Sequence, residues 1–343
     1  MEARALWLTA KEHAELRPAD APAPAAREVR VKAIASGISS GTEMLLYRGL
    51  GPVGQAMTPS TCEGSWGLPV KYGYQSVGRV IDAGKDSGYR GDELVFCRYP
   101  HQDYYTIDAT DPELVYRIPE FDPPEIGVLG NNADVALTAL LDVPVRLGDV
   151  VVVVGLGIVG MFCALLARRT AGRLIVVDPF EYRREIALRL GADVAVSPED
   201  AVDAVFAASE GRGSDVSIEA SGAPSGLQLA IDCSALEATV TVVGWYGNKQ
   251  VPLVLAPQFY SQRLKMVSSS VLYAGSGLQP RWDLGRKLQT ALDLLPSLHP
   301  EEMISHRVPF SRAPDAFRLL SEQLDQTMAV ILTYEEDDQA DPA

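Results

Sequence analysis

Three glycines in the middle of the chain have the spacing of a phosphate-binding loop. Gly155, Gly157 and Gly160 follow directly after the apolar run 150–154 and open a helical pattern. The first glycine of such a loop permits a tight turn, the second lets the backbone approach a pyrophosphate, and the third lets the helix pack closely. The backbone amides that should face the phosphates belong to Gly157, Ile158, Val159 and Gly160. The spacing predicts a dinucleotide site, and an ordinary glycine-rich turn is the alternative.

An acidic residue follows the next predicted strand, residues 174–177. The carboxylate of Asp178 can accept hydrogen bonds from an adenosine ribose and would repel a 2′-phosphate, which favours NAD over NADP. Arg183 and Arg184 could hold a 2′-phosphate, or they could lie in the solvated first turn of the following helix. We therefore predict NAD as the cofactor.

Strands and helices alternate through residues 133–275. The pattern predicts an α/β domain, a Rossmann doubly wound parallel sheet with helices on both faces. Loops after the later strands should line the same crevice. They contribute the candidate cofactor-binding residues Ser221, Gly222, Gly244 and Ser269. Plain turn chemistry is an equal alternative for the serines.

The rest of the chain has a different character. Residues 1–132 alternate short β-type runs with Gly/Pro-rich loops, which predicts a β-rich domain. The strands and helices of residues 276–335 are expected to return and complete that domain. The acidic segment 336–343 is expected to be a disordered tail.

Composition narrows the class of partner. The formal net charge is −15, so nonspecific binding to nucleic acid or to anionic membranes is not expected. No apolar run is long enough to span a bilayer. The four cysteines lie far apart, which favours reduced thiols and a cytoplasmic protein. No two histidines have the spacing of metal ligands. The cysteines are Cys62, Cys97, Cys163 and Cys233.

With these features in this order, the chain resembles the medium-chain dehydrogenase/reductase superfamily, the alcohol dehydrogenase fold. The fingerprint, Asp178 and the C-terminal segments 304–310 and 313–317 carry the resemblance, which spans roughly residues 3–334. It implies a GroES-like catalytic domain made of residues 1–132 and 276–335, and a homodimer. Four short segments resemble the bacteriochlorophyllide a dehydrogenase-like subgroup: 37–43, 47–49, 69–74 and 100–102.

The resemblance fails at the positions of the zinc ligands. The family's Cys falls on Ser39 or Ser40, its His on Tyr74, and its third ligand on Asn131. A hydroxyl, a phenol and an amide are poor zinc ligands at neutral pH. We therefore predict that the chain binds no metal at this position.

Without zinc, hydride transfer needs another group to stabilise or protonate the reacting oxygen. Tyr74 is the first candidate, and the ammonium of Lys71 could lower its pKa. Alternatively, Tyr74 only fills the vacated cavity and Lys71 is a solvated loop cation. Thr42 aligns with the family's proton-relay hydroxyl, and Glu43 could accept a hydrogen bond from the phenol. Oxygen-binding or structural roles are open for Ser40 and Asn131, and His101, on a predicted exposed loop, is an alternative acid/base.

The leading function is a zinc-independent, NAD(H)-dependent oxidoreductase that interconverts a secondary alcohol and a ketone. Reduction of an activated C=C bond and a catalytically silent dinucleotide-binding protein are the alternatives. The substrate, a small cyclic or natural-product molecule, should bind between the domains beside loop 49–69 and segment 273–282. Aromatic walls could come from Tyr47, Trp66, Tyr246 and Trp282.

Overall fold

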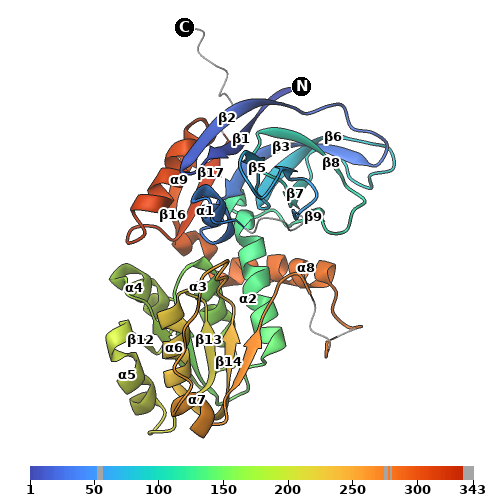
Figure 1. Cartoon of the computed structure of the whole chain (residues 1–343). Coiled ribbons are helices and arrows are strands. Elements are labelled where there is room, and N and C mark those ends of the chain that lie inside the picture. The colour runs from blue at the N-terminus through green and yellow to red at the C-terminus, as the bar shows by residue number, and fades with distance from the viewer. Residues whose placement is uncertain (52–56, 274–276, 279, 335–343) are drawn as a thin grey trace. The chain divides into compact units, whose positions relative to one another are not determined.

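The computed structural model describes residues 1–51, 57–273, 277–278 and 280–334, which fall into two units. The first unit combines Met1–Gly130 with Ile304–Ala343, and the second is the continuous segment Asn131–Met303 (Figure 1). The second unit includes helix α8 (Leu284–Leu294), whose residues the sequence analysis assigns to the catalytic domain.

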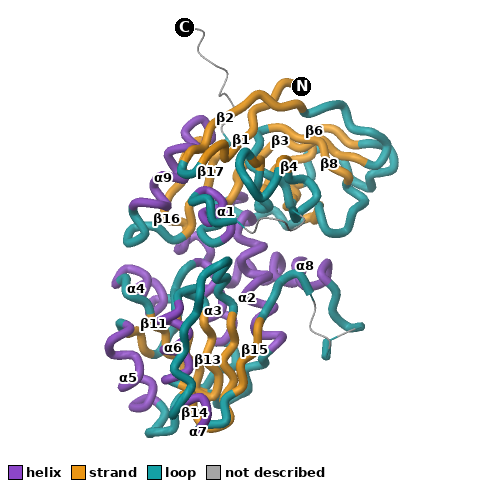
Figure 2. Tube along the Cα trace, in the orientation of Figure 1, coloured by secondary structure: helices purple, strands orange, loops and turns teal. Residues whose placement is uncertain are grey.

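A six-stranded sheet forms the centre of the second unit (Figure 2). All neighbouring strands are parallel, and Val154 pairs with both Val177 and Glu219, so the carboxyl ends of three strands are level. The predicted doubly wound parallel sheet is confirmed. Its strands, in spatial order, are β12 (Val194–Val196), β11 (Arg173–Val177), β10 (Val150–Val154), β13 (Ser214–Glu219), β14 (Ser234–Val242) and β15 (Lys265–Ser268).

The central strand β10 is buried on both faces, as a run of consecutive valines requires. Side chains alternate along a strand, so Val150, Val152 and Val154 share one face, which packs against α5 and α6. Val151 and Val153 point to the other face and are also buried. The helices of this unit are α2 (Gly130–Asp142), which begins at the boundary, α3 (Ile158–Ala167), α4 (Glu181–Arg189), α5 (Ala201–Ala208), α6 (Pro224–Asp232), α7 (Gln258–Ser261) and α8.

The first unit is β-rich, as predicted. A seven-stranded sheet has the order β16-β17-β3-β6-β7-β9, with β8 also paired to β3, and a four-stranded sheet has the order β2-β1-β5-β4. Strand β17 pairs with the end of β3, where Ile331 faces Gly37, so the C-terminal strands complete the sheet. The strands are β1 (Glu2–Ala10), β2 (His13–Asp20), β3 (Glu28–Gly37), β4 (Glu63–Gly64), β5 (Val70–Lys71), β6 (Ser76–Ala83), β7 (Leu94–Cys97), β8 (Tyr104–Asp108), β9 (Val115–Arg117), β16 (Ile304–Pro309) and β17 (Ala329–Thr333). Its α-helices are α1 (Thr42–Tyr47) and α9 (Ala313–Glu322).

One pairing in this unit positions the candidate site. Strands β3 and β6 are antiparallel, with Ser36 opposite Ser76, so the chain leaving β3 lies beside the chain entering β6. The backbone N–H of Gly37 donates to the carbonyl of Gln75 at 2.8 Å and fixes this junction. Residues 38–43 and 72–75 are therefore neighbours. Within the described ranges, no helix is both long enough and apolar enough to cross a membrane.

Candidate active site

The glycine loop of the second unit has the shape that a diphosphate needs. Gly155 has a φ of +94°, and a Cβ there would approach Ser221 within 2.6–2.7 Å. A Cβ at Gly160 would overlap the carbonyl oxygen of Gly155, so helix α3 can lie this close only with glycine. A Cβ at Gly157, by contrast, would meet no heavy atom of a described residue within 4 Å. The open side of Gly157 and the N-terminus of α3, which starts with Ile158, Val159 and Gly160, fit a bound dinucleotide.

Asp178 is attached to this loop from the end of β11. Its Oδ2 accepts the backbone N–H of Leu156 at 2.7 Å, and its Oδ1 accepts that of Phe180 at 2.9 Å. Arg183 Nη1 lies 3.7 Å from Asp178 Oδ2, and its guanidinium lies over the Phe180 ring at 4.8 Å. The Arg183 side chain is only 12% exposed, so it is not the solvated cation of the alternative interpretation.

Two further loops at the carboxyl edge of the sheet are joined by a residue that the sequence analysis missed. Glu219, the last residue of β13, is fully buried. Its Oε1 accepts from the backbone N–H and the hydroxyl of Ser221 at 2.7 and 2.5 Å and from the N–H of Gly222 at 2.9 Å. Its Oε2 accepts the Tyr246 hydroxyl at 2.7 Å. An acid at the end of a central strand, followed by hydroxyl side chains, is the signal that could have revealed it.

Gly244 and Ser269 occupy the same edge. A Cβ at Gly244 would come within 2.6 Å of Glu219 Oε2, so this loop also requires a glycine. Ser269 donates from Oγ to Asp142 Oδ2 at 2.9 Å, and it therefore has a structural partner. The candidate residues of the second unit thus gather at one edge of the sheet. Asn131 belongs to this unit as well, near the start of α2, and is buried.

Tyr74 lies in the first unit beside the start of α1. Its phenol is hydrogen-bonded to the hydroxyls of Ser39 and Thr42. Burial and the negative charge of Glu43 raise the pKa of Tyr74 to about 12, although the two hydroxyls act in the opposite direction. The phenol is therefore neutral and able to donate a proton at physiological pH.

The serine that reaches Tyr74 is Ser39 and not Ser40. Ser39 is buried, and its Oγ also accepts the backbone N–H of Thr42 at 3.2 Å, whereas Ser40 is exposed. The one-residue ambiguity in the sequence is thus resolved in favour of Ser39 as the neighbour of the phenol.

Glu43 has a partner other than the phenol. Its Oε2 lies 2.8 Å from His101 Nε2, and its Oε1 accepts the backbone N–H of Ser39 at 3.0 Å. Glu43 and His101 are each 1% exposed. The expectation that His101 is exposed is wrong, because the isolated bridge between Ala5 and Gln102 holds its segment against β1.

Lys71 is buried rather than solvated. Its contacts are with Glu63, Gln102 and Tyr99, whereas the role expected from the sequence is to lower the pKa of Tyr74. Its ammonium forms an ion pair with Glu63 and donates to Gln102 Oε1 at 3.0 Å. It also lies 5.5 Å from the centre of the Tyr99 ring. These contacts tie β5 to neighbouring segments, so Lys71 is a structural cation in this arrangement.

The expected aromatic walls divide into two kinds. Tyr47 and Trp66 are core residues, packed against Phe317 at 5.5 Å and Tyr72 at 5.3 Å. Tyr246 is held by Glu219, and Trp282 lies under Arg286 at 4.3 Å. Residues 52–56, 274–276 and 279 of the two predicted wall segments lie outside the described residues.

The donor set of the first unit does not fit zinc. Zinc sites use thiolate, imidazole and carboxylate ligands, whereas Ser39 and Tyr74 present a hydroxyl and a phenol. Among the residues that the structure describes, no three His, Cys, Asp or Glu side chains are grouped to hold a metal ion. The thiol of Cys62 donates to the carbonyl of Gly73 at 3.7 Å, and burial raises its pKa to about 12.

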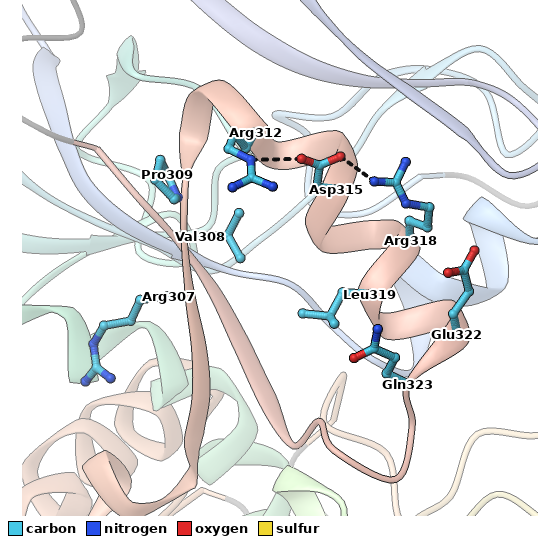
Figure 3. Close-up of a pocket in the computed structure, with 9 residues that line it drawn as sticks. All are labelled: Arg307, Val308, Pro309, Arg312, Asp315, Arg318, Leu319, Glu322 and Gln323. Carbon is cyan, nitrogen blue, oxygen red and sulfur yellow. Dashed lines mark hydrogen bonds and ion pairs between the residues drawn. The ribbon is translucent and has the colours of Figure 1, made fainter.

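In a small pocket between β16 and α9, the arginine side chains are already paired with a carboxylate. The pocket has a volume of about 270 Å³, and Asp315 lies in it between Arg312 at 2.9 Å and Arg318 at 2.8 Å (Figure 3). Arg307 on its rim is paired with Glu125 at 3.1 Å. Its arginines are already engaged, and the pocket contains none of the candidate site residues.

Comparisons with known proteins agree with this architecture. Residues 157–284, all in the second unit, match the family described as zinc-binding dehydrogenase. A D-guloside 3-dehydrogenase of Escherichia coli (strain K12) is 27% identical over 90% of this chain and 93% of its own length. An L-threonine 3-dehydrogenase of Pyrococcus abyssi is 29% identical over 69% of this chain and 74% of its own length.

Solved structures are similar over nearly the whole length. An Escherichia coli oxidoreductase/dehydrogenase of unknown specificity superposes with a TM-score of 0.81 at 16% identity, covering 98% of this chain and 100% of the other. A dehydrogenase from Sinorhizobium meliloti 1021 bound to NADP superposes with a TM-score of 0.77 at 20% identity, covering 97% and 99%. The similarity to dehydrogenases supports an oxidoreductase, and the chain has the medium-chain dehydrogenase/reductase fold, with a parallel Rossmann-type sheet and a β-rich companion unit.

Proposed function

We propose that this chain is an NAD(H)-dependent dehydrogenase that interconverts a secondary alcohol and a ketone without zinc. The observation that carries the proposal is the phenol of Tyr74, held by the hydroxyls of Ser39 and Thr42 at a position where the resemblance expects a zinc ligand. A neutral phenol can give a proton to a ketone oxygen or accept a hydrogen bond from an alcohol.

The nucleotide site supports NAD as the coenzyme. When bound, the nicotinamide would exchange a hydride with the substrate carbon. The amides of the Gly155 loop and the N-terminus of α3 would hold the diphosphate, and Asp178 would accept the ribose hydroxyls. Arg183 already faces Asp178 and the Phe180 ring, which reduces its availability for a 2′-phosphate. The neighbour that was solved with NADP makes NADP the alternative to test.

The residues around the reacting oxygen have separate tasks in this proposal. Tyr74 holds the proton at its hydroxyl oxygen, and Ser39 and Thr42 orient that hydroxyl. Burial keeps the phenol in its neutral form, because charge is unfavourable away from water. Glu43 acts on the phenol through its charge, since its oxygens are engaged by His101 and Ser39.

We propose a cyclic polyol or glycoside as the substrate class. The similarity to D-guloside 3-dehydrogenases over 93% of their length supports a ring that carries secondary hydroxyls. Membership of the bacteriochlorophyllide a dehydrogenase-like subgroup stays a prediction.

We also propose a homodimer that pairs through β15, the last strand of the six-stranded sheet. An uncovered strand edge can pair with a second copy. Apolar side chains on β15 and on the preceding helix α7 are exposed, among them Met266 at 37% and Tyr260 at 82%. Sedimentation of the wild type and of Met266→Lys tests the pairing, and a monomeric wild type would contradict it. The four free cysteines support a reducing compartment, so we propose a cytoplasmic location.

The experiment begins with the purified, dialysed chain. Binding of NADH and of NADPH is followed by coenzyme fluorescence, zinc is measured by elemental analysis, and NAD⁺ reduction is followed with a panel of glycosides and cyclic alcohols. We expect NADH to bind at least about tenfold more tightly than NADPH, no stoichiometric zinc, and oxidation of a ring hydroxyl. One equivalent of tightly bound zinc would overturn the zinc-free mechanism. Tighter NADPH binding with reduction of an enone would establish the C=C reductase alternative.

A further inference from the structure

A continuous line of hydrogen bonds crosses the core of the first unit. Glu43 Oε2 lies 2.8 Å from His101 Nε2, and His101 Nδ1 lies 2.6 Å from Ser36 Oγ. Ser36 Oγ in turn lies 2.8 Å from the hydroxyl of Tyr334. Glu43, His101 and Ser36 are each at most 1% exposed, so bulk water does not compete with these bonds.

The surroundings of this line are apolar. The His101 ring meets the edge of Phe317 at a centroid distance of 6.3 Å, and the Tyr334 ring packs on Phe310 at 4.5 Å. Desolvation of a carboxylate and an imidazole is costly, and apolar residues of similar volume would often be at least as stable. Stability therefore gives a weak reason for these polar groups, and their continuity suggests a function.

The inner end of the line reaches the candidate active site. Glu43 Oε1 accepts the backbone N–H of Ser39 at 3.0 Å, and the Ser39 hydroxyl is bonded to the Tyr74 phenol. The Glu43 charge also acts on that phenol. One water molecule between the Tyr74 cluster and the Glu43 carboxylate would complete the connection.

The outer end of the line lies beside a cavity. Tyr334 is partly buried and lines a cavity of about 970 Å³, together with Arg4, Asp103 and Tyr104. Asp103 lies 3.5 Å from the Arg4 guanidinium, so the mouth of the cavity carries opposite charges. The charged and titratable groups that face the line are Glu43, His101 and Tyr334 within it, Tyr74 and Cys62 at its inner end, and Asp103 and Arg4 at its outer end.

We propose that Glu43, His101, Ser36 and Tyr334 form a proton relay that connects the reacting oxygen with the cavity at Tyr334. The proposal rests on the proposed dehydrogenase function. In alcohol oxidation the C–H bond breaks and its hydride reduces NAD⁺, the O–H bond breaks, and the C=O double bond forms. The proton enters through the Tyr74 cluster and protonates Glu43, which passes a proton to His101 Nε2. Nδ1 then releases its proton through Ser36 and Tyr334 to water, which leaves His101 with its proton on Nε2 and the two hydroxyls reversed. Reorientation of the imidazole and the hydroxyls restores the starting state before the next proton, and ketone reduction runs the same path backwards.

The chain contains a matched pair of residues for a control. Ser76 Oγ lies 2.9 Å from the Tyr105 hydroxyl, and both residues are buried in the same unit. This Ser–Tyr pair has the same chemistry as Ser36 and Tyr334, but among the described residues the side-chain hydrogen bonds of Glu43 are to Ser39 and His101 and not to this pair. The test variants are therefore Ser36→Ala and Tyr334→Phe, and the control is Tyr105→Phe.

The first measurement does not depend on turnover. Exchange of the His101 imidazole N–H with water is followed by NMR on protein with labelled histidine, and His101→Gln identifies the signal among the four histidines. We expect both test variants to slow this exchange about tenfold and Tyr105→Phe to leave it unchanged. Exchange at the wild-type rate in folded Ser36→Ala and Tyr334→Phe would overturn the relay, even if the dehydrogenase activity is confirmed.

The second measurement uses NAD⁺ and an alcohol that the wild type oxidises, with NADH absorbance and a pH-indicator dye recorded together. We expect proton release and kcat to fall about tenfold in both test variants, with a larger solvent deuterium isotope effect and unchanged binding of NADH. Equal proton release in wild type and variants would refute the relay. A wild type that oxidises no alcohol would refute the proposed function instead, and the exchange measurement would then decide on the proton path alone.

Discussion

Asp178 Oδ2 accepts the backbone N–H of Leu156 at 2.7 Å, so the acid that would select the coenzyme also holds the glycine loop. Because the two tasks share one carboxylate, a change at Asp178 has to keep an acceptor if charge alone is to be tested. Asn meets this requirement at Leu156, since its amide oxygen can still accept that N–H. Its NH₂ group would face the Phe180 N–H, so the Tm of the variant is measured together with its coenzyme binding.

We predict that Asp178→Asn lowers the preference for NADH over NADPH about tenfold, about 1.4 kcal/mol, because repulsion of a 2′-phosphate is lost. Titration with each coenzyme, followed by fluorescence, measures the ratio. Asp193→Asn is a matched control: Asp193 Oδ2 accepts the N–H of Leu174 at 2.7 Å and lies 3.7 Å from Arg168. A ratio that is unchanged in Asp178→Asn would contradict the assignment of Asp178.

A substitution at Gly157 can test coenzyme binding separately from folding stability. Its φ is −64°, and a Cβ there has open space on the described side, so Gly157→Ala should fold normally. The added methyl would lie where the diphosphate is expected, and we predict at least about tenfold weaker NADH binding with a Tm within about 2 °C of the wild type. Gly160→Ala should instead lower the Tm strongly, because its Cβ would overlap the Gly155 carbonyl. Unchanged NADH affinity in Gly157→Ala would place the diphosphate elsewhere.

Glu219 fastens two loops at the carboxyl edge of the sheet. Glu219→Gln puts an amide NH₂ where a hydroxyl or backbone N–H now donates, so we predict a loss of about 1–3 kcal/mol in the free energy of unfolding, measured with urea. Tyr246→Phe removes one of these bonds and should lose about 1 kcal/mol. A Glu219→Gln protein as stable as the wild type would show that the loops do not depend on this carboxylate.

Tyr74→Phe should lower kcat for ketone reduction about 100-fold and leave NADH binding unchanged, because only the proton donor is removed. Tyr72→Phe is the control, since the Tyr72 ring meets Tyr74 edge-on at 5.8 Å but the Ser39 and Thr42 hydroxyls bond to Tyr74. Equal loss in both variants would point to packing and not to proton transfer.

The pKa of Tyr74 gives a direction for the effect of pH. Burial and the Glu43 charge raise it from 10.0 to about 12. The stability gained from the neutral phenol is therefore present below about pH 10 and is lost as the pH rises through about 12. The ultraviolet difference titration of wild type minus Tyr74→Phe should show one phenol ionising in that range. Glu43→Gln should move this ionisation to lower pH, and no movement would separate Glu43 from Tyr74 electrostatically.

Most of the fold of the second unit can be predicted from the sequence. Consecutive valines at 150–154, the glycine spacing and Asp178 are local signals, and the parallel sheet follows from the alternation of strands and helices. The exact ends of these elements are less evident from the sequence: α6 ends at Asp232 and β14 begins at Ser234, where three buried serines bond to one another.

The contacts of the first unit depend on long-range pairing that local patterns do not encode. Ser36 and Tyr334 meet because β17 returns to β3, and His101 is buried because its segment bridges to β1. Local patterns therefore favour an exposed His101, and they give no signal that singles out Ser36 or Tyr334. They also cannot distinguish Ser39 from Ser40, since a one-residue shift in a turn reverses which hydroxyl points inward.

The return of β17 to β3 has a consequence for biosynthesis. Residues 131–303 are continuous, so the nucleotide-binding unit can form while the ribosome is still translating, whereas the first unit waits for β16 and β17. A nascent chain that stops before Tyr334 would hold coenzyme without a finished proton path. In the proposed scheme the dehydrogenase would therefore reach its full rate only after translation has passed the last strand.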